Sequence, residues 1–138
     1  MTDFELIDHT ADVGIRARGK TLAQVFENAA RGMFSLLTDA ETIRPTETFP
    51  IQAHAMDTGA LLVRFLSELL FKFEAEKLMF KEFEVKSINE TRLEAVARGE
   101  KLDPTRHTVL TEIKSATYHL LKVEEEPGGW VAEVIFDL

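Results

Sequence analysis

The spacing of apolar side chains between residues 22 and 37 constrains the fold more than any other feature of this sequence. Apolar residues recur there at steps of three and four, which is the repeat of a helix with one buried face. Just before them, Thr21 and Gln24 have the spacing of a capping box, in which a hydroxyl and an amide each satisfy a free N–H group. The sequence therefore predicts an amphipathic helix from about Leu22 to Leu37.

A second helix and a series of strands are predicted by the same kind of pattern. Asp57 can cap a helix that runs to about Glu74 with its apolar residues on one face. Short apolar or alternating runs predict strands at residues 4–7, 13–18, 49–55, 80–88, 92–98, 117–125 and 130–136, with tight turns at 89–91 and 127–129. We therefore expect an α+β fold in which two amphipathic helices pack on one face of a mixed, mostly antiparallel sheet of about seven strands, in two layers.

Composition excludes several classes of function. The chain has 138 residues, 45% of them hydrophobic, which predicts one globular domain over residues 1–138. It has no cysteine, so disulfides, thiolate metal sites and a cysteine nucleophile are excluded. The formal net charge of −8 argues against strong direct binding of nucleic acid, because that affinity comes largely from neutralising phosphates. The N-terminus lacks the pattern of a signal peptide and charges interrupt the apolar stretch 60–73, so we expect a cytoplasmic protein without a membrane span.

Residues 99–115 form a long segment with only a weak strand pattern. Loops of this length are uncommon inside compact domains and are often functional. Asp103 opens a common type of turn with the proline that follows it. His107, together with Glu112 and Lys114, could act as an acid, a base or a clamp. The alternative interpretation is a solvated loop held by salt bridges.

Residues 8–12 read "DHTAD" and place Asp8, His9 and Asp12 close together. Aspartates are common in turns, because their side chains bind nearby backbone N–H groups. The alternative is a site for a hard cation, since calcium and magnesium prefer carboxylate and carbonyl oxygens. Asp12 alone supplies too few ligands, but the sequence ends in Asp137 and the α-carboxylate of Leu138. These groups would form an all-oxygen site if the last strand were pinned rather than frayed.

The remaining histidines carry weaker signals. His119 follows Tyr118 in a predicted strand, where the two side chains point to opposite faces and a histidine is more often simply hydrogen-bonded than catalytic. The spacing of His9, His107 and His119 does not resemble a zinc site. The sequence has no P-loop, nucleophile elbow or dinucleotide fingerprint, so it offers no signature of a free-standing enzyme.

Five segments, taken in order, resemble the archease family. They are "DHTADVGI", "TLAQVFENAARGMFSLLTD", "GEKLDPTRH", "EIKSATYHLLKV" and "WVAEVIFDL", and the resemblance runs from Ile7 to Leu138. The combination of "HTADVGI", "GEKLD", "TYH" and a terminal "FDL" is specific. Ser115 departs from the alanine expected at that position, which puts little in doubt.

The resemblance implies an accessory protein of RNA ligation, not an enzyme. Archeases assist the RtcB-type RNA ligase in tRNA splicing and RNA repair, by promoting its guanylation and its repeated turnover. The family's metal ligands fall on Asp12, Asp137 and Leu138, and the family's cation is calcium, although magnesium or manganese also suits such ligands. Lys114 matches a further functional position. His9, Asp103, His107 and His119 are expected to lie near the metal ligands or to contact the partner, and Asp8 is expected in a turn.

Two alternatives remain open at this point. Within the same family, the resemblance also implies a chaperone-like modulator of a tRNA cytosine methyltransferase. A different class is a metal-dependent hydrolase built on His9, Asp12 and Asp137. Against the hydrolase stands the lack of a nucleophile or base at a defensible spacing.

Overall fold

Helix α1 (Leu22–Leu37) begins where the predicted capping box places it. In the computed structural model, which describes residues 3–9 and 12–138, the hydroxyl of Thr21 accepts a hydrogen bond from the N–H of Gln24 at 3.1 Å. The side-chain oxygen of Gln24 accepts one in turn from the N–H of Lys20, at 2.8 Å. Two N–H groups that the helix cannot satisfy internally are thus satisfied by side chains, and the predicted bounds of the helix are confirmed.

Helix α2 (Thr58–Glu76) is capped by Asp57, as predicted. The carboxylate of Asp57 accepts a hydrogen bond from the N–H of Ala60 at 2.8 Å. The helix ends two residues later than Glu74, because Lys77 adopts a left-handed conformation with φ of 58° that cannot continue it. Neither helix in the described part of the chain combines the length and the apolar character that a membrane span requires.

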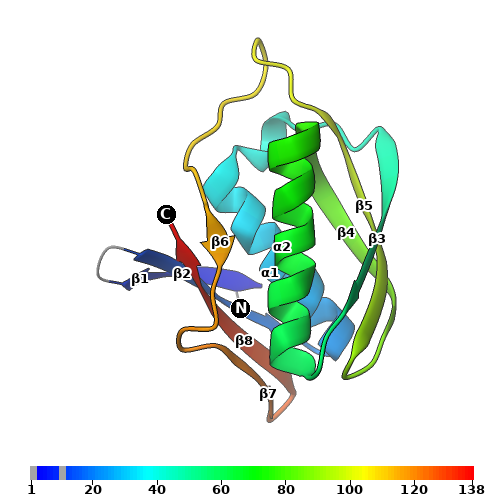
Figure 1. Cartoon of the computed structure of the whole chain (residues 1–138), viewed down its shortest axis with the longest axis vertical. Coiled ribbons are helices and arrows are strands. Elements are labelled where there is room, and N and C mark those ends of the chain that lie inside the picture. The colour runs from blue at the N-terminus through cyan, green and yellow to red at the C-terminus, as the bar shows by residue number, and fades with distance from the viewer. Residues whose placement is uncertain (1–2, 10–11) are drawn as a thin grey trace.

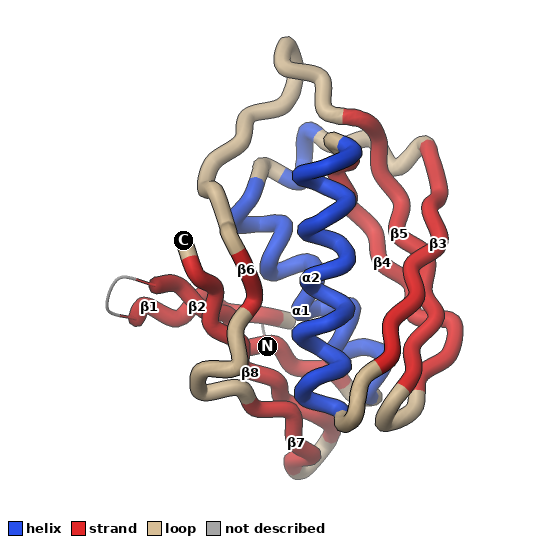
Figure 2. Tube along the Cα trace, viewed as in Figure 1, coloured by secondary structure: helices blue, strands red, loops and turns tan. Residues whose placement is uncertain are grey.

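The strands form two antiparallel sheets, with both helices between them (Figures 1 and 2). The first sheet has the order β1-β2-β8-β6, and β7 also pairs with β8; the second has the order β3-β5-β4. The strands are β1 (Phe4–His9), β2 (Asp12–Gly19), β3 (Glu47–His54), β4 (Leu78–Ile88), β5 (Arg92–Lys101), β6 (Ser115–Ala116), β7 (Lys122–Glu126) and β8 (Gly129–Asp137). A short 3-10 helix, Ala40–Thr42, links α1 to β3.

The α+β class, with two helices packed against antiparallel strands, is confirmed, but the layers differ from the prediction. Two sheets replace the single one, and every strand pairing among the described residues is antiparallel rather than mixed. The reason is the width of the apolar face of α1, which contacts β2 on one side and β4 on the other. On the β4 side, the ring of Phe34 lies with its centroid 5.6 Å from those of both Phe80 and Phe83.

The segment predicted as one strand over residues 117–125 is divided in the structure. Strands β6 and β7 both pair with β8, but residues 117–121 between them lie opposite only Val134 and Ile135. The extra residues leave the sheet as an exposed excursion, in which Leu120 has a left-handed φ of 53°. Tyr118 and His119 therefore do not lie on a strand, and the prediction that they point to opposite faces of one is wrong.

Candidate functional site

The register of the first sheet brings Asp12 and Asp137 to the same end of neighbouring strands. Val13 pairs with Phe136, so the next residues outward along the ladder are Asp12 on β2 and Asp137 on β8. Residues opposite each other on antiparallel strands project from the same face with their Cβ atoms about 5 Å apart. Asp12 thus neighbours Asp137 although 125 positions separate them in the sequence. Figure 2 shows the C-terminus beside the hairpin that β1 and β2 form.

Strand β6 adds Lys114 and Ser115 to this end of the sheet. Ser115 pairs with Asp137, and the backbone N–H of Lys114 donates a hydrogen bond to the carbonyl of Asp137 at 2.8 Å. The last strand is therefore held from both sides almost to its final residue, as the prediction of a pinned end requires. We call the set Asp12, Lys114, Asp137 and Leu138 the acidic end of the first sheet.

The acidic end is open to solvent. Asp12 is half-buried and makes a polar contact, whereas Lys114 and Asp137 are exposed and Leu138 is 40% exposed. Two carboxylates directly opposite each other in a sheet repel. Within the described part of the chain, no group of three or more histidine, aspartate or glutamate side chains is arranged to hold a metal ion. A cation here would depend on two side-chain carboxylates and the chain end.

The rest of the "DHTAD" motif is described only in part. Strand β1 includes Asp8 and His9, which pair with Val13 and Asp12. Asp8 is thus a strand residue, and the prediction that it lies in a turn is wrong, because β1 continues through His9. Thr10 and Ala11, and the side chains of Asp8 and His9, lie outside the residues whose placement is described.

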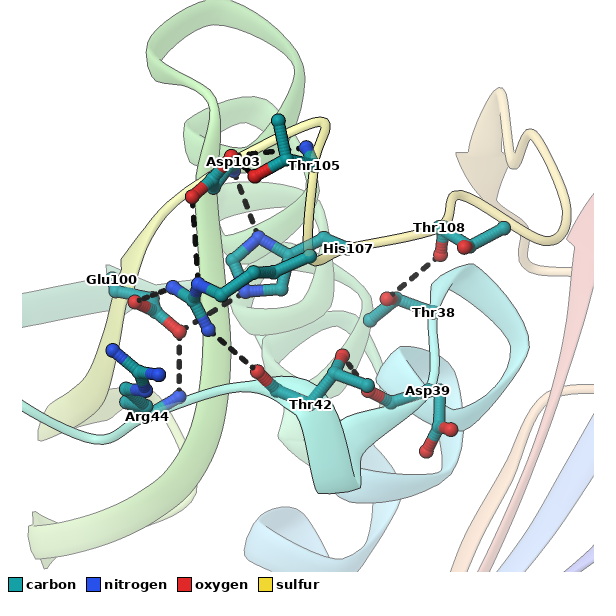
Figure 3. A network of polar contacts seen from close by, with 10 residues as sticks. Thr38, Asp39, Thr42, Arg44, Glu100, Asp103, Thr105, His107 and Thr108 are labelled. Atoms are coloured by element: carbon teal, nitrogen blue, oxygen red, sulfur yellow. Dashed lines mark hydrogen bonds and ion pairs between the residues drawn. The ribbon is translucent and has the colours of Figure 1, made fainter.

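The histidine of the long loop belongs to a different and buried cluster around Glu100 (Figure 3). The side chain of His107 is fully buried, and that of Glu100 is 12% exposed. Glu100 accepts hydrogen bonds from the N–H of Arg44 at 2.7 Å, from the guanidinium of Arg106 and from the ring of His107 at 3.0 Å. These contacts join the loop to strand β5 and to the segment before β3.

Both ring nitrogens of His107 are used within this cluster. The backbone N–H of Asp103 donates a hydrogen bond to Nδ1 at 2.8 Å, so the ring proton lies on Nε2, which donates to Glu100. The ring is fully buried and Nδ1, the nitrogen without a proton, already accepts the Asp103 N–H, so no lone pair is open to a proton from a substrate. The structure thus favours the salt-bridged alternative for His107 over an acid or a base.

The environment of Glu100 keeps its carboxylate charged. Burial alone would raise the pKa of Glu100, but the hydrogen bonds from the Arg44 N–H, from Arg106 and from His107 outweigh it and lower the pKa from 4.5 to about 2. The hydrogen bond to the Glu100 carboxylate in turn raises the pKa of Arg106. The cluster is therefore an ion pair between Glu100 and Arg106, with further hydrogen bonds to the Glu100 carboxylate from the Arg44 N–H and the His107 ring. It anchors the loop.

Asp103 also stabilises the conformation of the loop. Its carboxylate accepts hydrogen bonds from the hydroxyl of Thr105 at 2.7 Å and from the N–H of Thr105 at 3.0 Å, and these bonds lower the pKa of Asp103. Further along, the hydroxyl of Thr38 donates to the carbonyl of Thr108 at 2.9 Å. The loop that carries Asp103 and His107 lies at the opposite end of α2 from β7, apart from the strand ends that carry Asp12 and Asp137 (Figure 1).

The sequence-predicted site residues therefore fall into separate groups. The sheet register brings together the backbones of His9, Asp12 and Asp137, with Lys114 beside them, but not Asp103 or His107. His119 lies in the exposed excursion, where its N–H donates to the hydroxyl of Thr117 at 3.3 Å. Sequence reasoning did not identify Glu100 as the centre of the buried cluster; Arg106 and His107 lie nearby in the same motif, but the third donor is the N–H of Arg44, 56 positions away, which no local pattern links to it.

Comparisons with known proteins agree on one family. The model of the Archease protein family (MTH1598/TM1083) matches residues 4–138. The protein archease of Methanopyrus kandleri is 41% identical, with 98% of this chain and 99% of that protein covered, and that of Methanosarcina mazei is 40% identical, with 98% and 95% covered.

Solved structures show the same fold. The solution structure of Methanobacterium thermoautotrophicum protein 1598 has a TM-score of 0.86 and 36% identity, with both chains covered in full. A crystal structure from Thermotoga maritima, described as an archease and possible chaperone, has a TM-score of 0.64 and 21% identity, with 96% of this chain and 94% of that one covered.

Proposed function

The chain belongs to the archease family, and from that premise we propose that it is a non-catalytic accessory protein that activates an RtcB-type RNA ligase in tRNA splicing and RNA repair. Activation here means promoting the guanylation of the ligase and its repeated turnover. The observation that carries the proposal is the acidic end. Three segments that resemble archease motifs, "HTADVGI", "EIKSATYHLLKV" and "WVAEVIFDL", meet there through the pairing of β2, β8 and β6.

The chemistry of the acidic end fits a divalent cation. Asp12, Asp137 and the α-carboxylate of Leu138 offer oxygen ligands only, which suits calcium and also magnesium or manganese. A bound cation would supply positive charge that offsets the repulsion between neighbouring carboxylates. Asp12 is half-buried on a paired strand and Asp137 is held by the Lys114 N–H, so both carboxylates are carried by ordered backbone. Lys114 can stabilise the same negative charges or contact the partner.

Two routes from this site to activation are compatible with its position at an exposed strand end. The acidic end could enter the metal- and nucleotide-binding pocket of the ligase and arrange cations there. Alternatively, it could bind the guanylation-competent state of the ligase more tightly than the stalled one, and so shift the population toward it. Both routes require Asp12 and Asp137 to reach the partner, which their place at the end of the ladder allows.

The test is multiple-turnover RNA joining by the RtcB-type ligase of the same organism, with GTP, in the presence and absence of this protein. We expect product well beyond one turnover per ligase only when the protein is present, and loss of that stimulation in Asp12→Asn. The matched control is Glu125→Gln, which removes one exposed carboxylate from β7 of the same sheet. Full stimulation by folded Asp12→Asn would exclude the acidic end, and no stimulation by the unmodified protein would exclude the ligase as its client.

A second candidate function is a chaperone-like modulator of a tRNA cytosine methyltransferase. The observation that favours a client protein in general is a group of exposed apolar side chains on the segments that flank β6, namely Val109, Leu110, Tyr118 and Leu120. Co-purification with a methyltransferase rather than with a ligase would decide for this candidate. Turnover of phosphoesters by the purified protein alone, abolished by Asp12→Asn, would instead support the metal-dependent hydrolase.

A further inference from the structure

A second polar site lies on the other sheet, in a cavity of about 230 Å³ between the end of β3, the middle of α2 and the start of β5. We call it the basic cavity. Its lining residues are Gln52, Ala53, His54, Arg64, Arg92, Leu93 and Glu94. His54 pairs with Arg92 and Gln52 pairs with Glu94, so these four side chains project from the same, outward face of the sheet.

The positive charge of the basic cavity is not neutralised within the protein. In the part of the chain that the structure describes, no ion pair joins Arg64 or Arg92 to an acidic group, although Glu94 lines the same cavity. Arg98 on the same strand differs, since its guanidinium binds Glu84 at 2.8 Å. In a chain with a net charge of −8, two guanidinium groups beside an imidazole therefore form a local exception to the acidic surface.

Hydrogen bonds to the backbone order the strand ends that carry several of the lining residues. The side-chain oxygen of Asn89 accepts hydrogen bonds from the N–H groups of Thr91 and Arg92, each at 2.9 Å, which sets the start of β5. The N–H of Ala55 donates to the carbonyl of Thr91 at 2.9 Å, which ties the end of β3 to the same turn. Figure 1 shows the connection from β3 to α2 and the turn from β4 to β5 at the same end of the molecule.

The cavity continues past Arg92. An adjoining cavity of about 220 Å³ is lined by Ser87, Ile88, Asn89, Arg92, Leu93 and Glu94. The two cavities share Arg92, Leu93 and Glu94 of β5. A ligand larger than one ion would have room on both sides of these residues.

From this arrangement we propose that the basic cavity binds the phosphate group of a phosphate ester. A guanidinium presents a fork of N–H donors that matches two oxygens of a phosphate, and the cavity has two such groups from different elements together with an imidazole. Two guanidinium groups from different elements can bind oxygens on different sides of a tetrahedral acceptor. A carboxylate has only two oxygens in one plane, whereas a phosphate ester offers a tetrahedral set. The proposal goes beyond the ligase-activating function and does not depend on it.

The experiment is a titration of the full chain, followed by amide NMR, with inorganic phosphate at constant ionic strength. We expect saturable shifts centred on Gln52, His54, Arg64 and Arg92, and much weaker shifts with acetate. In the double variant Arg64→Gln/Arg92→Gln, phosphate affinity should fall by about tenfold or more, since it loses two charge-assisted contacts. Both residues are exposed, so the variant should keep the amide spectrum of a folded protein elsewhere.

Arg98→Gln is the matched control, because it removes the same charge from the same strand outside the cavity, and it should bind phosphate with unchanged affinity. Shifts that grow linearly and spread over the whole surface, equal binding by the double variant, or acetate binding as strong as phosphate binding would each overturn the proposal. Adenosine monophosphate and a short single-stranded RNA then distinguish the source of the phosphate. Tighter binding of the RNA assigns the cavity to a nucleic-acid backbone, and equal or weaker binding assigns it to a small ester; both results support a phosphate site.

Discussion

At the base of the long loop, Glu100 is 12% exposed and accepts hydrogen bonds from three donors, whereas Asp137 at the end of β8 is exposed and lies next to another carboxylate. In the first arrangement, donors within the protein balance the charge of the carboxylate. The second places like charges side by side where solvent and a partner can reach them. An acidic group of the first kind contributes to stability, and one of the second kind is available for binding.

The contrast separates two uses of the same residue types. Histidine and carboxylates occur in both "DHTAD" and "GEKLDPTRH". In the second motif, His107 uses both ring nitrogens to hold the loop, and Asp103 binds the backbone two residues on. In the first, Asp12 projects beside Asp137 at a strand end. Substitutions in the two regions should therefore have opposite consequences for stability and for binding.

The largest difference is expected from removal of each carboxylate. Glu100→Ala leaves the buried ring of His107 and the N–H of Arg44 without their acceptor and removes the main ion-pair partner of Arg106, so we expect the free energy of unfolding to fall by about 3 kcal/mol. Asp137→Ala should change it by less than about 0.5 kcal/mol, because the side chain is exposed. Urea unfolding, followed by the fluorescence of Trp130, measures both. Equal losses in the two variants would contradict the comparison.

The next effect is the dependence of stability on pH that Glu100 contributes. Its pKa is lowered from 4.5 to about 2 in the folded protein, so the unfolded chain takes up the proton first as the pH falls. The stabilisation is complete above about pH 4.5 and is lost between about pH 4.5 and 2. We expect the difference in free energy of unfolding between the unmodified protein and Glu100→Gln to shrink by about 2 kcal/mol over that interval, less than the full shift implies because solvent reaches part of the group.

Urea titrations at a series of pH values give this difference directly, and it isolates Glu100 because all other carboxylates titrate alike in both proteins. The control is Glu84→Gln, which alters an exposed pair with Arg98 and Lys86. A difference that stays constant down to pH 2 would show that the Glu100 carboxylate is not stabilised by its three donors.

Features that depend on neighbours in the chain could be predicted from the sequence. The caps at Thr21 and Asp57 and the bounds of α1 follow from local spacing, and the structure confirms them. The division into two sheets could not be predicted, because an alternating pattern shows that a strand has a buried face but not which strand it pairs with. The excursion at residues 117–121 was missed for the same reason, since it is defined by the register against β8.

The candidate site divides in the same way. The sequence raised Asp12, Asp137 and Leu138 as one of two alternatives, and the resemblance to archease made them the expected metal ligands. The ladder register shows that the two aspartates are neighbours, while the cation remains a prediction. Glu100 takes two donors, Arg106 and His107, from its own motif, but its third donor is the N–H of Arg44, 56 positions away, and no pattern in the sequence links those two residues. Long-range pairing thus contributes to deciding which acidic groups are structural.

Addition of calcium should stabilise the protein through the acidic end. A ligand that binds only the folded state at ten times its Kd raises the free energy of unfolding by about 1.4 kcal/mol. We expect that increase for the unmodified protein and for Glu125→Gln, but not for Asp12→Asn. Thermal or urea unfolding with and without calcium measures it, after titration calorimetry has given the Kd. The same increase in Asp12→Asn would place the cation elsewhere.

The smallest expected effect concerns the α-carboxylate of Leu138. A peptide tag fused after Leu138 converts this group to an amide and removes one negative ligand, while Asp12 and Asp137 stay in place on their strands. Because the affinity of an oxygen site for calcium depends on its number of charged ligands, we expect the Kd to rise by about threefold. The matched control carries the same tag before Met1. Titration calorimetry that gives equal affinities for the two tagged proteins would remove Leu138 from the site and leave the two aspartates as its only charged ligands.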